Sequence, residues 1–326
     1  MKQLDNKTTR IEWIDIARGV TILLVVYGHI AFSAIPILNK YFGAFRMPLF
    51  FIISGTLFSI LKYNSFGNFI KRRGRGLILP YIYCSLIVLT GYTLLGKYHF
   101  IDQAYEVLTT GWKYALWFIP VLFCCELAYF TINRYLERYK ILIIIILLAT
   151  GRILSHYNIH AIYSLSFVPT AIFYYGVGDI CTHKLKRNEF NMRWVIGALI
   201  LSAIFSTTIF LSPCKVKYGA NQLGDIWCFI SSISGSIMMI LCSIIAAKSI
   251  NYRLKRIPIF LGQNSYALLA FHQLVVNAIV WATPLHGTLA RIAMWIVLTI
   301  IILSTNRYLP SLFCKKKCNL RNIQVG

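Results

Sequence analysis

The sequence predicts an all-α fold, a bundle of about ten helices that cross a membrane. Hydrophobic residues make up 58% of the 326-residue chain and charged residues only 13%, about half the charged share of an ordinary soluble domain. Apolar runs of roughly 17 to 23 residues recur along the whole chain, and each is long enough for a helix that crosses the bilayer. We therefore expect one membrane domain over residues 1–326 and no appended soluble domain.

The basic residues give this bundle a direction. We expect spans at about 16–36, 45–62, 77–96, 114–132, 141–156, 161–181, 194–212, 226–247, 258–282 and 289–309. With both termini cytoplasmic, 24 Lys and Arg residues fall on the inner side and 8 on the outer side, as the positive-inside rule requires of a multi-pass protein of the cell (inner) membrane. Topology and anionic lipid headgroups then account for the net charge of +23, so the expected partner is the bilayer and not nucleic acid.

The first span carries a polar stripe. Asp15, Arg18 and His29 recur at spacings that bring them to one helix face, with Arg18 and His29 about 16 Å apart along the axis. Ionisable residues inside a span are costly and usually functional, and a neutral imidazole can act as a general base toward a hydroxyl group. A structural alternative stays open, in which His29 bonds a neighbouring hydroxyl and Arg18 extends to the inner headgroups.

A dense basic cluster precedes the third span, in the segment KRRGRGLILPY. Arg72 and Arg75 are three residues apart and share a face if the segment is helical. Two guanidinium groups at this spacing suit phosphate groups, which they can bind bidentately. Topology alone is the alternative explanation of the cluster.

In the second span, Ser54 and Gly55 favour close helix packing over a nucleophilic role for Ser54.

Polar residues in later spans complete the candidate set. Ser265 and His272 are seven residues apart and share a helix face. By our span boundaries, His272 lies at about the depth of His29, so neighbouring helices would give the two histidines a common polar cavity. Trp117 marks the outer interface, and Glu126, deeper in the same span, needs an arginine or a hydroxyl as partner.

The cysteines do not suggest a metal site. Cys314 and Cys318 flank three lysines in the C-terminal tail, but no second cysteine pair or nearby histidine completes a set of ligands. Most of the other cysteines fall within spans, where cysteine behaves as a small hydrophobic residue. We expect no metal.

These segments together resemble the integral-membrane acyltransferase-3 family over nearly the whole chain. The opening is the most specific part, with an aspartate, an Arg-Gly pair and a histidine after ten further residues. The matching positions are Asp15, Arg18, Gly19 and His29; the second-span motif FRMPLFFIISG; the arginine pair Arg72 and Arg75; LWFIPVLF with Trp117; and Gly262, Asn264, Ser265 and His272. IEWIDIARG is also similar to the subgroup of sugar O-acetylases.

The resemblance implies a ten-helix bundle that takes an acyl group, usually acetyl, from coenzyme A in the cytoplasm. It implies transfer of that group to a hydroxyl of a cell-surface or lipid-linked glycan. The expected roles are phosphate binding by Arg18, Arg72 and Arg75, and catalysis by His29 with Asp15 orienting Arg18. The remaining candidates, Ser54, Trp117, Ser265 and His272, are expected to line the cavity.

Two other classes of function stay open. A transporter or flippase for a glycan or an anion would also line its pathway with intramembrane His and Arg, although no inverted repeat is visible. A structural or sensory partner in glycan assembly would keep the fold without the activity. Within the enzyme hypothesis, the acceptor sugar, the acyl group, the membrane face, direct transfer against an acetyl-histidine intermediate and the oligomeric state are all open.

Overall fold

The described part of the chain is helical throughout. The computed structural model describes residues 11–30, 35–112, 115–157, 159–187, 192–213, 225–283 and 287–308, and it has no strand within them. The α-helices are α1 (Glu12–His29), α2 (Pro36–Thr56), α3 (Phe66–Arg73), α4 (Leu79–Leu94), α5 (Phe100–Thr110), α6 (Phe118–Tyr135), α7 (Lys140–His156), α8 (Val168–Arg187), α9 (Met192–Ser206), α10 (Ile226–Ser249), α11 (Tyr252–Gln263), α12 (Ser265–Ala282) and α13 (Gly287–Tyr308). The predicted all-α class is confirmed.

Seven helical stretches in the described ranges are long and apolar enough to cross a membrane. They are 66–94, 100–135, 137–156, 192–211, 226–249, 265–282 and 289–308. The sequence predicts about ten spans, which is three more than these seven stretches. The other three predicted spans correspond to α1, α2 and α8, helices of 18, 21 and 20 residues whose sequences include charged residues such as Asp15, Arg46 and Asp179.

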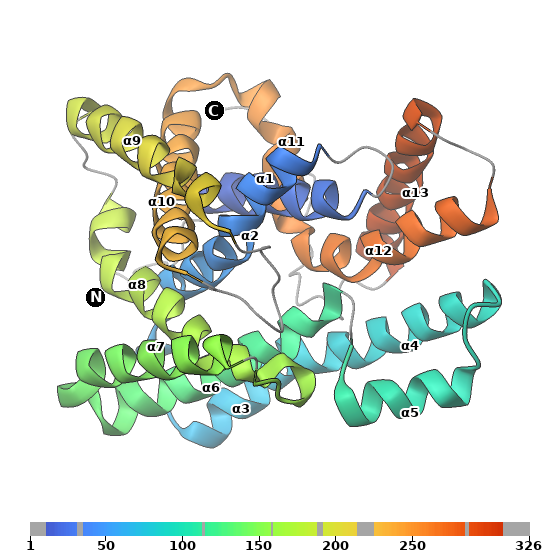
Figure 1. The fold of residues 1–326 in the computed structure, drawn as a ribbon, viewed down its shortest axis with the longest axis horizontal. Helices are drawn as coiled ribbons and strands as arrows, with labels where there is room; N and C mark the ends of the chain where they lie inside the picture. Colours follow the sequence, from blue (N-terminus) through green and yellow to red (C-terminus); the bar gives the residue numbers. More distant parts are fainter. Residues whose placement is uncertain are drawn as a thin grey trace, which may run out of the picture.

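These three more polar helices lie inside the bundle. Helix α1 packs against α2, α10, α11 and α12, and α2 packs against α8 and α10. Helices α7, α9 and α13 each have their main contact with one inner helix, namely α8, α10 and α12 respectively. Figure 1 shows α1 and α2 in the interior, with α9 and α13 toward opposite sides. A polar helix in this position exchanges lipid contact for protein contact, which its charged residues require.

Helix α1 crosses α11 at very short range, through one glycine from each helix. A Cβ on Gly19 would collide with the carbonyl oxygen of Pro258. A Cβ on Gly262 would collide with the carbonyl oxygen of Asp15. Small residues permit such close backbone contact between membrane helices, so both motif glycines are explained by packing. The crossing fixes the depth of α1 relative to the segment that leads into α12.

A second crossing of the same kind joins α2 to α8. A Cβ on Gly55 would collide with the carbonyl oxygen of Tyr175, and a Cβ on Gly178 would collide with that of Ile52. The Ser54-Gly55 pair thus serves close packing, as its composition predicted. Together the two crossings hold the inner helices α1, α2 and α8 around one polar region.

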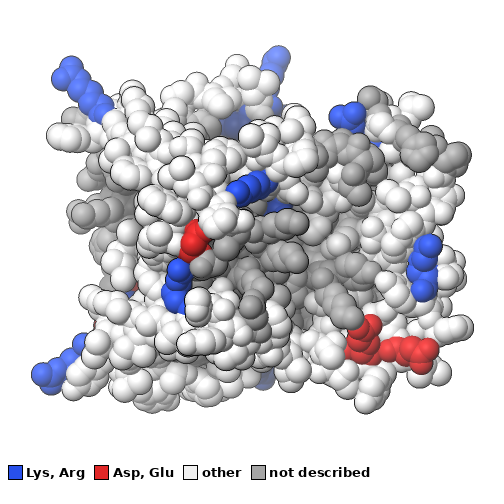
Figure 2. Space-filling model, in the orientation of Figure 1, with Lys and Arg blue, Asp and Glu red and all other residues white. Residues whose placement is uncertain are grey.

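The outer helices present apolar side chains to the surroundings. On α7, Ile141, Ile145 and Ile146 are exposed, and on α9 Ile200 and Ile204 are exposed. Figure 2 shows a face whose described part is mostly uncharged, with scattered Lys and Arg groups, one acidic group beside a basic one, and two further acidic groups close together. Large exposed apolar surfaces are rare on soluble monomers, so this surface is that of a protein surrounded by lipid.

Several helix boundaries differ from the predicted spans. Helix α1 ends at His29, so His29 is its last residue and not the centre of a span over 16–36. Helix α8 begins at Val168 rather than at 161, because the preceding turn, Ile162–Phe167, has positive φ at Tyr163 and Ser164, which an α-helix does not tolerate. The predicted span 258–282 is divided at Asn264 into α11 and α12.

A π-helical turn, η2 (Gly74–Ile78), joins α3 directly to α4. It follows Arg73 at once and contains both glycines of the segment KRRGRGLILPY, Gly74 and Gly76. Turns of this type carry one extra residue per turn compared with the α-helix and frequently occur at functional sites. The turn lets the basic cluster and the membrane-embedded α4 follow different helical registers.

The glycine crossings predict that valine destabilises the protein at Gly55 but not at Gly197. We expect Gly55→Val to lower the free energy of unfolding by about 2 kcal/mol, because the backbone of α8 must move to admit the side chain. The matched control is Gly197→Val on α9, where a Cβ meets nothing within 4 Å. Thermal unfolding in detergent, followed by tryptophan fluorescence, measures the difference. Equal stability of the two variants would contradict the close crossing.

Candidate functional site

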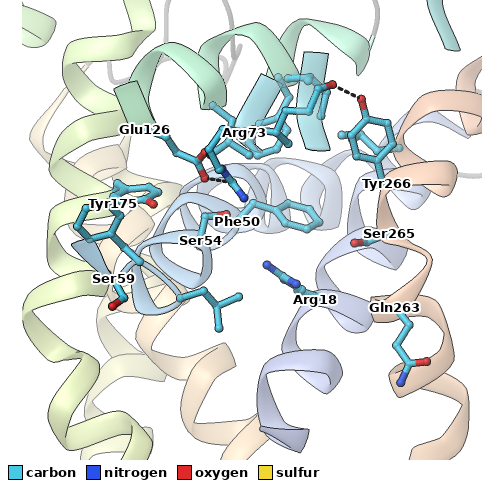
Figure 3. Close-up of a pocket in the computed structure, with 18 of the residues that line it drawn as sticks. Arg18, Phe50, Ser54, Ser59, Arg73, Glu126, Tyr175, Gln263, Ser265 and Tyr266 are labelled. Atoms are coloured by element: carbon cyan, nitrogen blue, oxygen red, sulfur yellow. Dashed lines mark hydrogen bonds and ion pairs between the residues drawn. The ribbon is translucent and has the colours of Figure 1, made fainter. Parts of the chain in front are cut away.

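A cavity of about 290 Å³ opens among the inner helices. Its walls come from α1, α2, α3, α6 and α8, and from the α11–α12 segment. The lining residues are Arg18, Phe50, Ser54, Leu57, Phe58, Ser59, Tyr63, Phe69, Arg73, Leu77, Phe118, Ile119, Leu122, Glu126, Tyr175, Gly262, Gln263, Ser265, Tyr266 and Leu269. Figure 3 shows Arg18, Ser54, Arg73, Glu126 and Ser265 around a common space, whereas the side chains of Ser59 and Gln263 point away from it. A concave site with convergent polar groups is a common form of small-molecule site.

One wall of the cavity holds a buried ion pair. Arg73, the last residue of α3, donates from Nε and Nη2 to the two carboxylate oxygens of Glu126 on α6. The Glu126 side chain is 3% exposed and the Arg73 side chain 31%, so the carboxylate is enclosed while the guanidinium reaches the open side. This bidentate arrangement uses two of the five guanidinium N–H groups and fixes the plane of the fork.

Arg18 enters the same cavity from α1. Figure 3 shows its side chain pointing into the space between the Arg73–Glu126 pair and the α11–α12 segment. The lining contains two arginines and one glutamate, so its formal charge is positive. A partly enclosed cation of this kind attracts anions more strongly than a solvated surface cation does. The cavity can therefore receive a ligand with phosphate or carboxylate groups.

Hydroxyl and amide groups also line the cavity. Ser54 on α2 and Ser265 at the start of α12 are among them. Tyr266 donates from its hydroxyl to the carbonyl oxygen of Leu77, 3.0 Å away, which ties α12 to the π-helical turn. Gln263, at the end of α11, is also part of the lining, but Figure 3 shows its amide group directed away from the Arg73–Glu126 pair.

Two histidines lie together farther along α1. The rings of His29 and His272 have their centroids 5.1 Å apart and are inclined by 53°. His29 is half-buried, whereas His272, in the middle of α12, is fully buried. Helix α1 packs against α12 as well as against α11, and this packing brings the two histidines side by side. Neither histidine lines the cavity described above.

The remaining sequence candidates occupy different surroundings. Asp15 is buried, at 4% exposure, where α1 crosses α11. Arg72 and Arg75 are exposed and lie outside the cavity lining; the Arg72 guanidinium lies 5.7 Å from the ring centroid of Tyr63. Trp117 is half-buried against Phe118 and Phe167; it is outside the cavity lining, although its neighbour Phe118 is part of it.

Sequence reasoning did not single out Arg73, the arginine that reaches the cavity. It treated the basic cluster as a phosphate-binding pair at Arg72 and Arg75 and left Glu126 with an unidentified partner. The expectation that Glu126 needs an arginine or a hydroxyl is confirmed by its ion pair. Asp179, on α8, is likewise bonded to the Lys140 ammonium and the Tyr129 hydroxyl. The acidic residue Glu126, placed deep in a span, was the signal that could have identified an arginine of the basic cluster as its partner.

No metal site is found within the described ranges. They hold no group of three or more His, Cys, Asp or Glu residues that could bind a metal ion. The cysteines discussed for the tail, Cys314 and Cys318, lie outside the described residues.

The fold and the site define a class, namely a multi-pass helical membrane protein with a cationic cavity among its inner helices. A family model described as an acyltransferase domain matches residues 11–305. The chain belongs to this family, acyltransferase-3, and is a membrane acyltransferase. No curated protein and no solved structure matches the chain.

The ion pair predicts non-additive stability effects. Glu126→Leu should lower the free energy of unfolding by about 3 kcal/mol, because it leaves Arg73 charged and without its carboxylate. The double variant Arg73→Met/Glu126→Leu should recover most of that loss, since apolar pairs replace buried ion pairs well. Chemical denaturation in detergent measures both, with Arg138→Met, at an exposed position, as the control. Additive losses would show that the two side chains act independently.

Proposed function

We propose that the protein is an O-acetyltransferase of the cell (inner) membrane. It moves an acetyl group from cytoplasmic acetyl-CoA to a hydroxyl group of a cell-surface or lipid-linked glycan. The family membership supports acyl transfer. The observation that carries the finer proposal is the geometry of α1, which presents Arg18 in a cationic cavity and ends at a histidine beside a second histidine.

The cavity supplies the donor site of this proposal. Coenzyme A is a polyanion, and Arg18 and Arg73 are the cationic groups that line the cavity. Glu126 fixes the Arg73 guanidinium before the ligand arrives, which lowers the entropy lost on binding. Arg72 and Arg75, exposed on the adjoining segment, attract the phosphate groups toward the entrance. Exposed cations of this sort act mainly on the rate of association.

Helix α1 gives the proposal its direction. Eleven residues separate Arg18 from His29, about 16 Å along a helix. An extended thioester whose phosphate groups lie near Arg18 can therefore reach toward His29 with its acyl end. Asp15, buried one turn before Arg18, helps to hold that arginine in place. The close crossing of α1 with α11 keeps this distance constant.

His29 acts as the general base in this mechanism. It takes the proton of the acceptor hydroxyl while the hydroxyl oxygen forms a bond to the thioester carbonyl carbon. The carbon–sulfur bond then breaks, and the sulfur of coenzyme A leaves with the proton that His29 returns. Apolar surroundings exclude water that would otherwise compete with the glycan as acceptor.

The donor site predicts a hierarchy among the arginines. Arg73→Ala and Arg18→Ala should each weaken binding of radiolabelled acetyl-CoA about tenfold, since each removes a cation from the cavity. Arg72→Ala should weaken binding less, and its effect should disappear at high salt because that side chain is exposed. Arg138→Ala is the matched surface control. Unchanged binding in Arg73→Ala would place the donor elsewhere.

The catalytic role predicts a separation of binding from turnover. His29→Ala should retain acetyl-CoA binding but lose at least about 100-fold in acetyl transfer, the usual contribution of a positioned base. Alkali-labile O-acetyl groups on surface glycan, measured by NMR in a strain that carries only the variant, give the readout. Wild-type acetylation by a stably inserted His29→Ala protein would rule out the mechanism.

A further inference from the structure

The two ring nitrogens of His272 have different surroundings. Nδ1 lies 2.8 Å from the carbonyl oxygen of Leu268 and 3.1 Å from that of Leu269. Carbonyl oxygens only accept hydrogen bonds, so Nδ1 carries a hydrogen and donates it. In the neutral ring, Nε2 then has a lone pair and no hydrogen. The backbone of α12 therefore determines the tautomer of this side chain.

The Nε2 lone pair is buried without a hydrogen-bond partner among the described residues. His272 is completely buried, at 0% exposure, and buried polar atoms in native proteins nearly always have a partner. An acceptor retained in this state suggests a partner that arrives when the site is in use. The ring beside it belongs to His29, at 5.1 Å between centroids.

A charged side chain near the two histidines, Arg46, already makes hydrogen bonds to other groups. Arg46, on α2, packs its guanidinium against the backbone of Gly28, next to His29. It donates to Asn39 Oδ1 at 3.0 Å and to the Leu24 carbonyl oxygen at 3.4 Å. His29 is half-buried at the end of α1, and its ring lies beside that of His272. A rotation of its ring can bring an N–H group to His272 Nε2.

We propose that His272 is a positioning residue for His29, whose ring N–H donates to the lone pair of His272 Nε2. This bond leaves the other nitrogen of His29 unprotonated and directed at the acceptor hydroxyl. The inference rests on the proposed function, because it assigns a role within the same transfer. The half-buried His29 then contacts substrate, and the fully buried His272 supports it from behind.

The proton balance of the step is unchanged by His272. The hydroxyl proton moves to the free nitrogen of His29 as the oxygen–carbon bond forms, and it moves on to sulfur as the carbon–sulfur bond breaks. His272 neither gains nor loses a proton. It accepts one hydrogen bond throughout, and that bond strengthens while His29 is positively charged.

The tautomer can be tested without any acetyl transfer. Solid-state NMR of protein carrying ¹⁵N-labelled histidine should show His272 with a protonated Nδ1 and an unprotonated Nε2, assigned by the signals lost in His272→Gln. The Nε2 signal should shift in His29→Phe, which removes the donor. A protonated Nε2, or an Nε2 signal that is the same with and without His29, would overturn the inference.

Activity provides the second test. Glutamine can place an acceptor oxygen near the position of Nε2, so His272→Gln should keep kcat within about tenfold of wild type, whereas His272→Phe should lose about 100-fold. KM for acetyl-CoA should stay unchanged in both, and His99→Phe, at an exposed position, is the control. Equal kcat in the Gln and Phe variants would overturn the positioning role. Wild-type protein that transfers no acetyl group would overturn the proposed function, while the NMR result would still decide the tautomer.

Discussion

The contact on which the rest of the site depends is the crossing of α1 and α11 through Gly19 and Gly262. Backbone lies directly on backbone there, so neither helix can slide without a collision. In an interior packed this closely, a shift of one helix must also move the helix in contact with it. The crossing sets the depth of Arg18 on α1, and the packing of α1 against α12 brings His29 beside His272. The position of one helix thus determines both the place of Arg18 in the cavity and the contact between the two histidines.

Two ion pairs add a second constraint, which joins other helices than the first. The Arg73–Glu126 pair connects α3 to α6, and the Lys140–Asp179 pair connects α7 to α8. Both hold charges within or beside an apolar bundle, where an unpaired charge would be costly. The first pair lines the cavity and the second does not. The same kind of ion pair therefore forms part of a cavity wall in one place and joins two helices away from the cavity in the other.

Composition and hydrophobic runs were sufficient to predict the helical membrane class, because apolar runs of spanning length have few other uses. They were not sufficient to count the spans, since α1, α2 and α8 carry charges that only burial by neighbouring helices makes tolerable. Spacing on one helix could relate Arg18 to His29. It could not choose Arg73 over Arg72 or Arg75, because that choice depends on where α6 places Glu126. The late start of α8 depends on positive φ at Tyr163 and Ser164, residues with no compositional tendency toward it.

The π-helical turn after Arg73 sets the rotation of α4 about its own axis. Each residue of a helix contributes about 100° of rotation, so the surplus residue in Gly74–Ile78 rotates α4 relative to α3. Loss of that one residue would turn a different side of α4 toward the lipid, while the ion pair would keep α3 anchored to α6. The same loss would also move Leu77, which lines the cavity and accepts the hydrogen bond from Tyr266. The length of this turn therefore sets both the face that α4 turns to the lipid and the shape of one cavity wall.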